Sequence, residues 1–134
     1  MRHIHPPERD IEVRDAFASI GSVATTDVVH LYGLIGGMDE MDNELWRLWP
    51  LAEVRAENKG PSPHGALFAD YLLHCWCYRL QPMSPDISAV YVDHFDGKAP
   101  TLVASSLAQF FDAYLADARH LLVPPSPGSP DRSP

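Results

Sequence analysis

The stretch FADYLLHCWCYRL, residues 68–80, constrains the fold most, because it is apolar or aromatic at nearly every position. A strand with one face in water alternates apolar and polar residues, whereas a strand covered on both faces reads as an almost continuous apolar run. We therefore interpret residues 68–80 as one central strand, bent near Leu72. Such a strand predicts a sheet that is flanked by helices.

The same stretch holds both cysteines and a histidine, and strand geometry indicates what these groups do. Neighbouring side chains of a strand point to opposite faces, so Cys75 and Cys77 share one face and His74 lies on the other. This separation of thiol and imidazole argues against a nucleophile–base pair. A disulfide between the two cysteines is also disfavoured, since side chains that run parallel at this separation bridge poorly. We expect both thiols to pack in the core.

A zinc site on these cysteines would need four convergent ligands, and a C-x-C pair supplies at most two. A site with two cysteines and two histidines, using His64 or His94, stays open on the sequence alone. The amine of Met1 and the imidazole of His3 have the spacing of a square-planar Cu(II) or Ni(II) chelate, which usually has no biological role. We predict no metal centre and no cofactor.

Hydrophobic periodicity predicts the remaining elements. In residues 105–122 apolar side chains recur at helical spacing, and Ser106 with Gln109 has the spacing of a capping box. Asp96-Gly97, between two segments rich in β-formers, is typical of a hairpin turn. The predicted helices cover roughly residues 7–20, 25–35, 51–58 and 105–122, and the predicted strands cover residues 44–49, 68–80, 88–95 and 100–105. These elements predict an α+β fold, with a mainly antiparallel sheet of about five or six strands flanked by three to four helices.

The length of 134 residues is that of one domain, and a hydrophobic fraction of 46% is enough to build its core. The C-terminal segment VPPSPGSPDRSP is rich in proline and serine and has almost no apolar side chains. Such a segment cannot recover its ordering entropy by burial. We predict a single domain over residues 7–122, followed by a disordered tail over residues 123–134.

Acidic residues outnumber basic ones, with 18 Asp and Glu against 10 Lys and Arg, and the formal net charge is −8. This balance argues against binding to a phosphate backbone, and it is typical of a soluble protein or of one with a basic partner. No window approaches the ~20 apolar residues of a membrane span, and the first residues do not read as a signal peptide. We therefore expect reduced thiols and a cytoplasmic protein that binds neither nucleic acid nor membrane.

The segment GGMDEMDNE follows the second predicted helix and holds the four acids Asp39, Glu40, Asp42 and Glu44. It does not match the calcium-binding loop, which needs ligands at alternate positions, a central glycine and a distal glutamate. Two interpretations stay open, a solvated loop and a binding site for a basic partner surface. The four acids are candidate partner-binding residues on the second interpretation.

Two tryptophans and two aspartates raise further alternatives. Trp46 and Trp49 lie on opposite faces of their predicted strand, and we expect core packing for both. If one of them were exposed it would be a binding anchor, so Trp46 joins the partner-binding candidates. Asp70 and Asp93 would shift each other's pKa if their strands were adjacent. No phosphate loop, nucleophile elbow or other catalytic motif accompanies them, so we expect no catalysis.

From about Thr25 to Asp117 the chain reads VVHLYGLIGGMDEMDNELWRLWPLAEVRAEN, then LFADYLLHCWCYRL, then AVYVDHFDG and VASSLAQFFDAYLAD. A tryptophan-containing strand, a short helix that ends at Asn58, a strand that opens with FAD and a closing Ser-aromatic helix occur in this order. In that order and spacing the chain resembles the SUKH superfamily of Smi/Knr-like proteins. It departs from the family pattern at YLLHCWCY, where many relatives have a Gly-containing turn.

The resemblance implies an α+β domain with a mainly antiparallel sheet, and no catalytic residues that the family shares. Many bacterial proteins of this kind are immunity proteins that bind and neutralise a cognate toxin, often a nuclease or a deaminase. A net charge of −8 and the acidic segment suit a toxin with a basic surface, because complementary charge speeds association. The alternative is a regulatory or scaffold module of Smi/Knr type, which acts in cell-wall or signalling assemblies.

Overall fold

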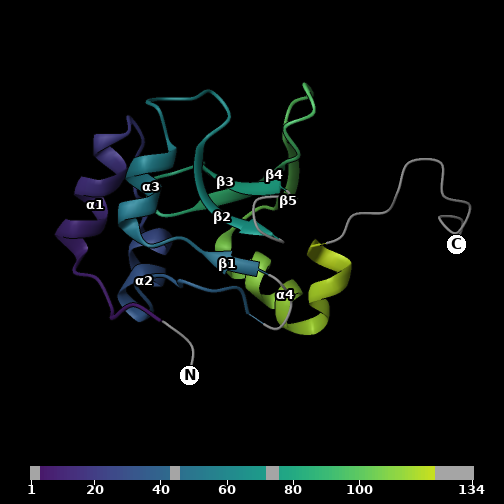
Figure 1. Cartoon of the computed structure of the whole chain (residues 1–134), viewed down its shortest axis with the longest axis horizontal. Coiled ribbons are helices and arrows are strands. Elements are labelled where there is room, and N and C mark those ends of the chain that lie inside the picture. Colours follow the sequence, from purple (N-terminus) through teal and green to yellow (C-terminus); the bar gives the residue numbers. More distant parts are fainter. Residues whose placement is uncertain (1–3, 43–45, 72–75, 123–134) are drawn as a thin grey trace, which may run out of the picture.

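The computed structural model describes residues 4–42, 46–71 and 76–122, and it describes side chains as far as residue 116. The predicted disordered tail over residues 123–134 lies outside these ranges. In the described residues one antiparallel sheet has the strand order β1-β2-β3-β4-β5, so each strand pairs with the next one along the chain (Figure 1). This arrangement confirms the predicted α+β fold with a mainly antiparallel sheet.

The helices and strands alternate irregularly along the chain. The helices are α1 (Asp10–Ser19), α2 (Thr26–Leu34), α3 (Leu51–Glu57) and α4 (Leu107–Leu122). The strands are β1 (Trp46–Leu48), β2 (Ala66–Tyr71), β3 (Trp76–Pro82), β4 (Ser88–Asp93) and β5 (Thr101–Ala104). Helix α1 packs against α2 and α3, α3 packs against β2, and α4 packs against β4 and β5 (Figure 1).

Residues 68–80 do not form the single central strand that their composition predicts. They contain the end of β2 and most of β3, which pair antiparallel with Asp70 opposite Cys77 and Tyr71 opposite Trp76. Residues 72–75 between the two strands lie outside the described ranges. The prediction was wrong because side chains at successive positions are buried in both strands, at 68–70 in β2 and at 77–78 in β3, so each strand reads as an apolar run.

The helix boundaries follow local sequence signals. Helix α1 ends where Gly21 adopts a φ of +79°, a conformation that glycine reaches at little cost. Helix α4 begins after the predicted cap, since the Gln109 amide donates to Ser106 Oγ at 3.0 Å. Helix α1 starts three residues later than predicted, at Asp10, because the Glu8 amide donates to the Tyr32 carbonyl at 2.8 Å and keeps this segment extended beside α2.

A bulge in β2 is tied to the end of α3. The register between β2 and β3 shifts between Leu67 and Ala69. The side chain of Asn58, directly after α3, donates through Nδ2 to the Leu67 carbonyl at 2.9 Å and accepts from the Leu67 amide, also at 2.9 Å. Because the amide group satisfies both backbone groups of the residue next to the bulge, it fixes α3 over one face of the sheet.

Alternate residues of the strands build two different layers. On one face, which we call the α4 face, Trp46 and Tyr78 contact the ring of Phe110. On the other face, which we call the α3 face, Arg47 and Asp70 lie opposite each other in the register of β1 and β2. Trp46 and Trp49 are both buried, with exposed fractions of 4% and 1%, which confirms core packing for both.

Candidate functional site

The acidic loop, which we define as residues 38–42 between α2 and β1, begins from a well-held position. Ile4 forms an antiparallel bridge with Met38, and the Met38 amide donates to the Leu48 carbonyl at 2.8 Å. Two glycines precede this point, and a Cβ on Gly36 would lie 2.1 Å from the Pro6 carbonyl oxygen. The Gly-Gly pair therefore lets the N-terminal segment approach the chain directly before the loop.

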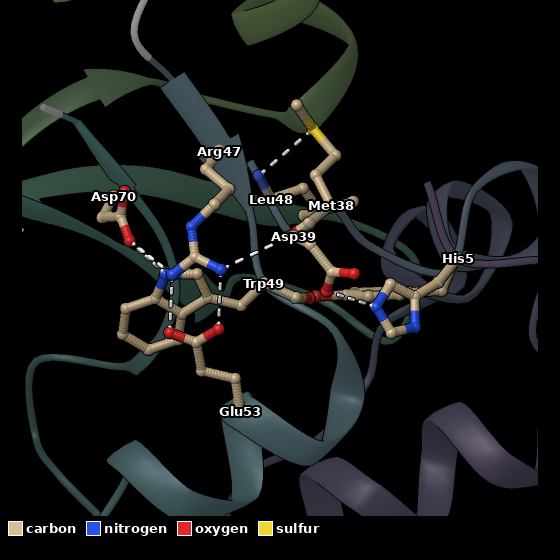
Figure 2. A network of polar contacts seen from close by, with 9 residues as sticks. His5, Met38, Asp39, Arg47, Leu48, Trp49, Glu53 and Asp70 are labelled. Atoms are coloured by element: carbon tan, nitrogen blue, oxygen red, sulfur yellow. Dashed lines mark hydrogen bonds and ion pairs between the residues drawn. The ribbon is translucent and has the colours of Figure 1, made fainter. Parts of the chain in front are cut away.

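The predicted partner-binding acids have different environments. Asp39 and Glu40 are exposed, and Asp39 accepts a hydrogen bond of 2.7 Å from Nε2 of His5 (Figure 2). Asp42 is half-buried and holds the loop in place, because its carboxylate accepts from the Trp46 amide at 3.1 Å and from the Tyr114 hydroxyl. Glu44 lies outside the described residues. Asp39 and Glu40 therefore present carboxylates at the surface, Asp39 while bonded to His5, whereas Asp42 links the loop to β1 and α4.

Trp46 is the last of the predicted partner-binding residues, and its position is internal. Among the described residues its ring contacts the aromatic side chains of Phe68, Phe110, Phe111 and Tyr114. At 4% exposure it has almost no surface to offer, so the exposed-anchor alternative is wrong for Trp46 and, by the same observation, for Trp49.

A polar network lies under the acidic loop (Figure 2). The guanidinium of Arg47 donates to both carboxylate oxygens of Glu53, at 2.8 and 2.6 Å. It also donates to the Met38 carbonyl at 3.2 Å and to Oδ2 of Asp70 at 2.9 Å. The same oxygen of Asp70 accepts from Nε1 of Trp49 at 2.7 Å. One arginine therefore joins the first residue of the loop to β1, α3 and β2.

The network is almost closed to water. The side chains of Arg47 and Asp70 are 12% and 1% exposed. The hydrogen bond with Glu53 raises the pKa of Arg47 further above its ordinary value, so the guanidinium stays charged at any physiological pH. A buried charge that loses its partner is strongly destabilising, which makes the network an all-or-none support for the loop.

Asp70 and Asp93 do not lie on adjacent strands, which corrects the alternative that they share a site. They lie on β2 and β4, one on each side of β3, and both are in register with Cys77. Each carboxylate has its own arginine, because Arg79 Nε donates to Asp93 Oδ2 at 2.8 Å and Arg47 serves Asp70. The two aspartates are therefore parts of two separate ion pairs.

The thiol of Cys77 lies between these two aspartates, with an exposed fraction of 2%. Burial first, and the carboxylates of Asp70 and Asp93 second, raise the pKa of Cys77 to about 12. The thiol is therefore protonated at neutral pH, and a protonated thiol is a poor nucleophile and a poor metal ligand.

The sequence left open a zinc site of cysteines and histidines and a Cu(II) or Ni(II) chelate at the N-terminus. Among the described residues no group of three or more His, Cys, Asp or Glu side chains is placed to hold a metal ion. His64 is exposed, and His94 makes an edge contact with the ring of Trp76. Cys75, His74 and the terminal residues Met1 and His3 lie outside the described ranges, so the Cu(II) or Ni(II) chelate stays a prediction.

Sequence reasoning missed the network because its members come from distant segments. Arg47 and Asp70 are 23 positions apart and meet only through the register of β1 and β2. The available signal was a charged residue at an alternate position in each of two otherwise apolar segments.

Comparison with known proteins found no match to this chain among family models, curated proteins or solved structures. In the described part of the chain, no helix has the length and apolar character that crossing a membrane requires.

Proposed function

We propose that this chain is a non-catalytic protein-binding module of the SUKH-like immunity type, which binds and neutralises a cognate toxin with a basic surface. The observation that supports it best is the acidic loop, where Asp39 and Glu40 are exposed on backbone that is fixed from below. The fixing contacts are the bridge from Ile4, the Arg47 hydrogen bond to the Met38 carbonyl, and the attachment of Asp42 to β1 and α4.

A fixed loop binds more tightly than a mobile one with the same charges, because less conformational entropy is lost on association. The charge also suits a basic partner, since a net charge of −8 attracts a cationic surface and speeds the encounter. An interface of standard size uses about 800 Å² of each partner, which a domain of this size can offer beside the loop.

The non-catalytic part of the proposal is supported by the burial and pairing of the reactive side chains. Cys77 is buried with its pKa raised to about 12, and Asp70 and Asp93 are each paired with an arginine. These groups lie in register across three strands, but in a closed layer of the protein, where a substrate has no access to the buried Asp70. They stabilise the sheet that carries the loop.

The proposal is tested with the protein encoded beside this chain's gene, which is the candidate toxin. We expect the two proteins to co-purify as a stoichiometric complex, and co-expression of this chain to protect cells from the toxin. The Asp39→Lys, Glu40→Lys double variant should protect less than an Asp15→Lys, Asp96→Lys variant, which removes the same charge elsewhere.

Failure to form a complex and failure to protect would both count against the immunity assignment. Recovery of several weakly bound proteins, with no toxin among them, would instead favour the regulatory or scaffold alternative. Turnover of a substrate by the purified chain would contradict the non-catalytic assignment.

A further inference from the structure

A groove of about 430 Å³ lies between α2, α4 and the β3–β4 connection, and the proposed function does not use it. Most of its lining is apolar and comes from all three segments. The apolar lining residues are Leu31, Leu34, Ile87, Leu107, Ala108 and Phe111. Its volume falls within the range of binding sites in proteins, roughly 300–1,000 Å³.

One wall of the groove is fixed by hydrogen bonds between α2 and the β3–β4 connection. The amides of Thr26 and Asp27 donate to the carbonyls of Pro85 and Asp86, at 3.1 and 3.0 Å. In return Oδ2 of Asp27 accepts from the Ser88 amide at 3.1 Å, and Oδ1 of Asp86 accepts from the Thr26 hydroxyl at 2.7 Å. These contacts form the groove before any partner binds.

Large apolar side chains are exposed along the groove. Leu34 is 68% exposed and Ile87 is 39% exposed. Leu115, which is 81% exposed, lies one turn beyond Phe111 on α4 and therefore extends the same stripe. Contiguous apolar surface of this kind on a folded protein marks an interaction site.

The charges around the groove are acidic. The described residues that line it include Asp27, Asp86 and the exposed His30 but no lysine or arginine, and exposed Asp112 adjoins Phe111 on α4. The polar atoms of Asp27 and Asp86 are bonded within the rim and do not converge on the apolar floor. The groove thus fits an apolar surface bordered by positive charge better than it fits a polar small molecule.

We infer that the α2–α4 groove binds an amphipathic helix of the partner protein, with large apolar side chains on one face and lysine or arginine beside them. The inference rests on the proposed function only in taking the partner to be a protein. A helix presents apolar residues at i, i+3, i+4 and i+7 in one line, which matches a groove with a helix along each side.

Two other occupants fit the groove less well. The segment 123–134 of this chain follows α4, but its sequence is rich in proline and has almost no large apolar side chains. A second copy of the chain would bring a second acidic rim and a second charge of −8 toward the first. A cationic helix from another protein avoids both problems.

The inference is tested on the full chain with a defined probe, a labelled helical peptide of leucine and lysine with leucine at i, i+3, i+4 and i+7. We expect binding, measured by fluorescence anisotropy, that Leu34→Glu and Ile87→Glu each weaken at least tenfold. Leu102→Glu is the matched control, because Leu102 is 53% exposed on β5 and shares its register row with Tyr91, away from the groove. A matched leucine–glutamate peptide should bind at least tenfold more weakly than the lysine peptide.

Each glutamate adds a negative charge, which by itself would strengthen binding of a cationic peptide, so weakening at the groove alone identifies the site. Equal affinity of all three variants, no binding of the lysine peptide, or equal binding of the acidic peptide would overturn the inference. A dimer in light scattering that only Leu34→Glu and Ile87→Glu dissolve would assign the groove to a second copy instead. Thermal unfolding of each variant checks that it is folded. If Leu34→Glu does not fold, Ile87→Glu still tests the groove, because Ile87 lies outside the helices.

The failure of this inference can be told apart from that of the proposed function. A toxin complex that forms equally well with Leu34→Glu and Leu102→Glu would leave the function standing without the groove. Peptide binding at the groove without any toxin complex would leave the groove standing without the immunity assignment.

Discussion

On the α4 face of the sheet the core is aromatic, whereas on the α3 face the same strands bury arginine, aspartate and cysteine. Trp46 and Arg47 are neighbours in β1, and Cys77 and Tyr78 are neighbours in β3, so the pleat alone sends them to different layers. The aromatic face holds α4 by shape and apolar contact. The polar face holds α3 and Met38, the first residue of the acidic loop, through hydrogen bonds with fixed directions.

The largest expected effect compares the two faces by placing a leucine in each. Asp70→Leu removes the carboxylate that Arg47 and Trp49 share, and we expect it to lower the free energy of unfolding by about 3–5 kcal/mol. Phe110→Leu, on the aromatic face, should cost only about 1–2 kcal/mol, because one apolar side chain replaces another. Urea unfolding measures both changes.

A triple variant sharpens this test. Arg47→Met, Glu53→Leu and Asp70→Leu together remove all three charges of the network, so the triple variant should recover part of the stability that Asp70→Leu loses. If Asp70→Leu proves cheaper than Phe110→Leu, the polar layer is not the all-or-none support that we describe.

The next effect concerns the thiol of the polar face. The pKa of Cys77 is raised from 9.0 to about 12, so this thiol stays protonated in the folded state while the unfolded chain ionises above about pH 9. The folded state then binds more protons, and the contribution of Cys77 is complete below pH 9 and is lost as pH rises toward 12. Between pH 8 and pH 10 the free energy of unfolding of the natural chain should fall by about 1 kcal/mol more than that of Cys77→Ala.

Chemical unfolding at a series of pH values measures that difference. The comparison with Cys77→Ala cancels the tyrosines, among them Tyr32 and Tyr78, whose pKa values burial also raises. Parallel pH profiles for the two proteins would mean that the thiol is not held in a closed layer.

The smallest effect is expected where the aromatic face contacts the acidic loop. Tyr114→Phe keeps the ring that packs on Trp46 but removes the hydroxyl that donates to Asp42. We expect the free energy of unfolding to fall by about 1 kcal/mol and hydrogen exchange in residues 38–42 to become faster. Tyr91→Phe on β4 is the control, and equal exchange in both variants would show that α4 does not hold the loop.

Local sequence signals were enough for the helices, except for the start of α1, which a contact with α2 shifts to Asp10. Ser106 with Gln109 marks the start of α4, and Gly21 marks the end of α1, because caps and stops act within one turn of the chain. The strand pairing of residues 88–93 with 101–104 also followed from nearby sequence. The α+β class could therefore be predicted without knowledge of any tertiary contact.

Contacts between distant segments could not be predicted. Nothing in residues 72–75 carries the glycine or proline that usually separates two strands, so the β2–β3 pair read as one strand. The acids of the loop were visible, but the difference between exposed Asp39 and tethered Asp42 depends on Tyr114, which is 72 positions away. The groove likewise joins α2 to α4, which are separated by the whole sheet in sequence.

The association rate of this chain with the proposed toxin tests the central claim, that the fixed acidic loop guides a basic partner to this chain. The rate is measured by stopped-flow mixing over a range of ionic strength, for the natural chain and for two double variants of equal charge. Asp39→Lys with Glu40→Lys should lower the rate about tenfold at low salt and flatten its salt dependence. The control, Asp15→Lys with Asp96→Lys, should stay close to the natural chain, and identical rates for the two variants would contradict the claim.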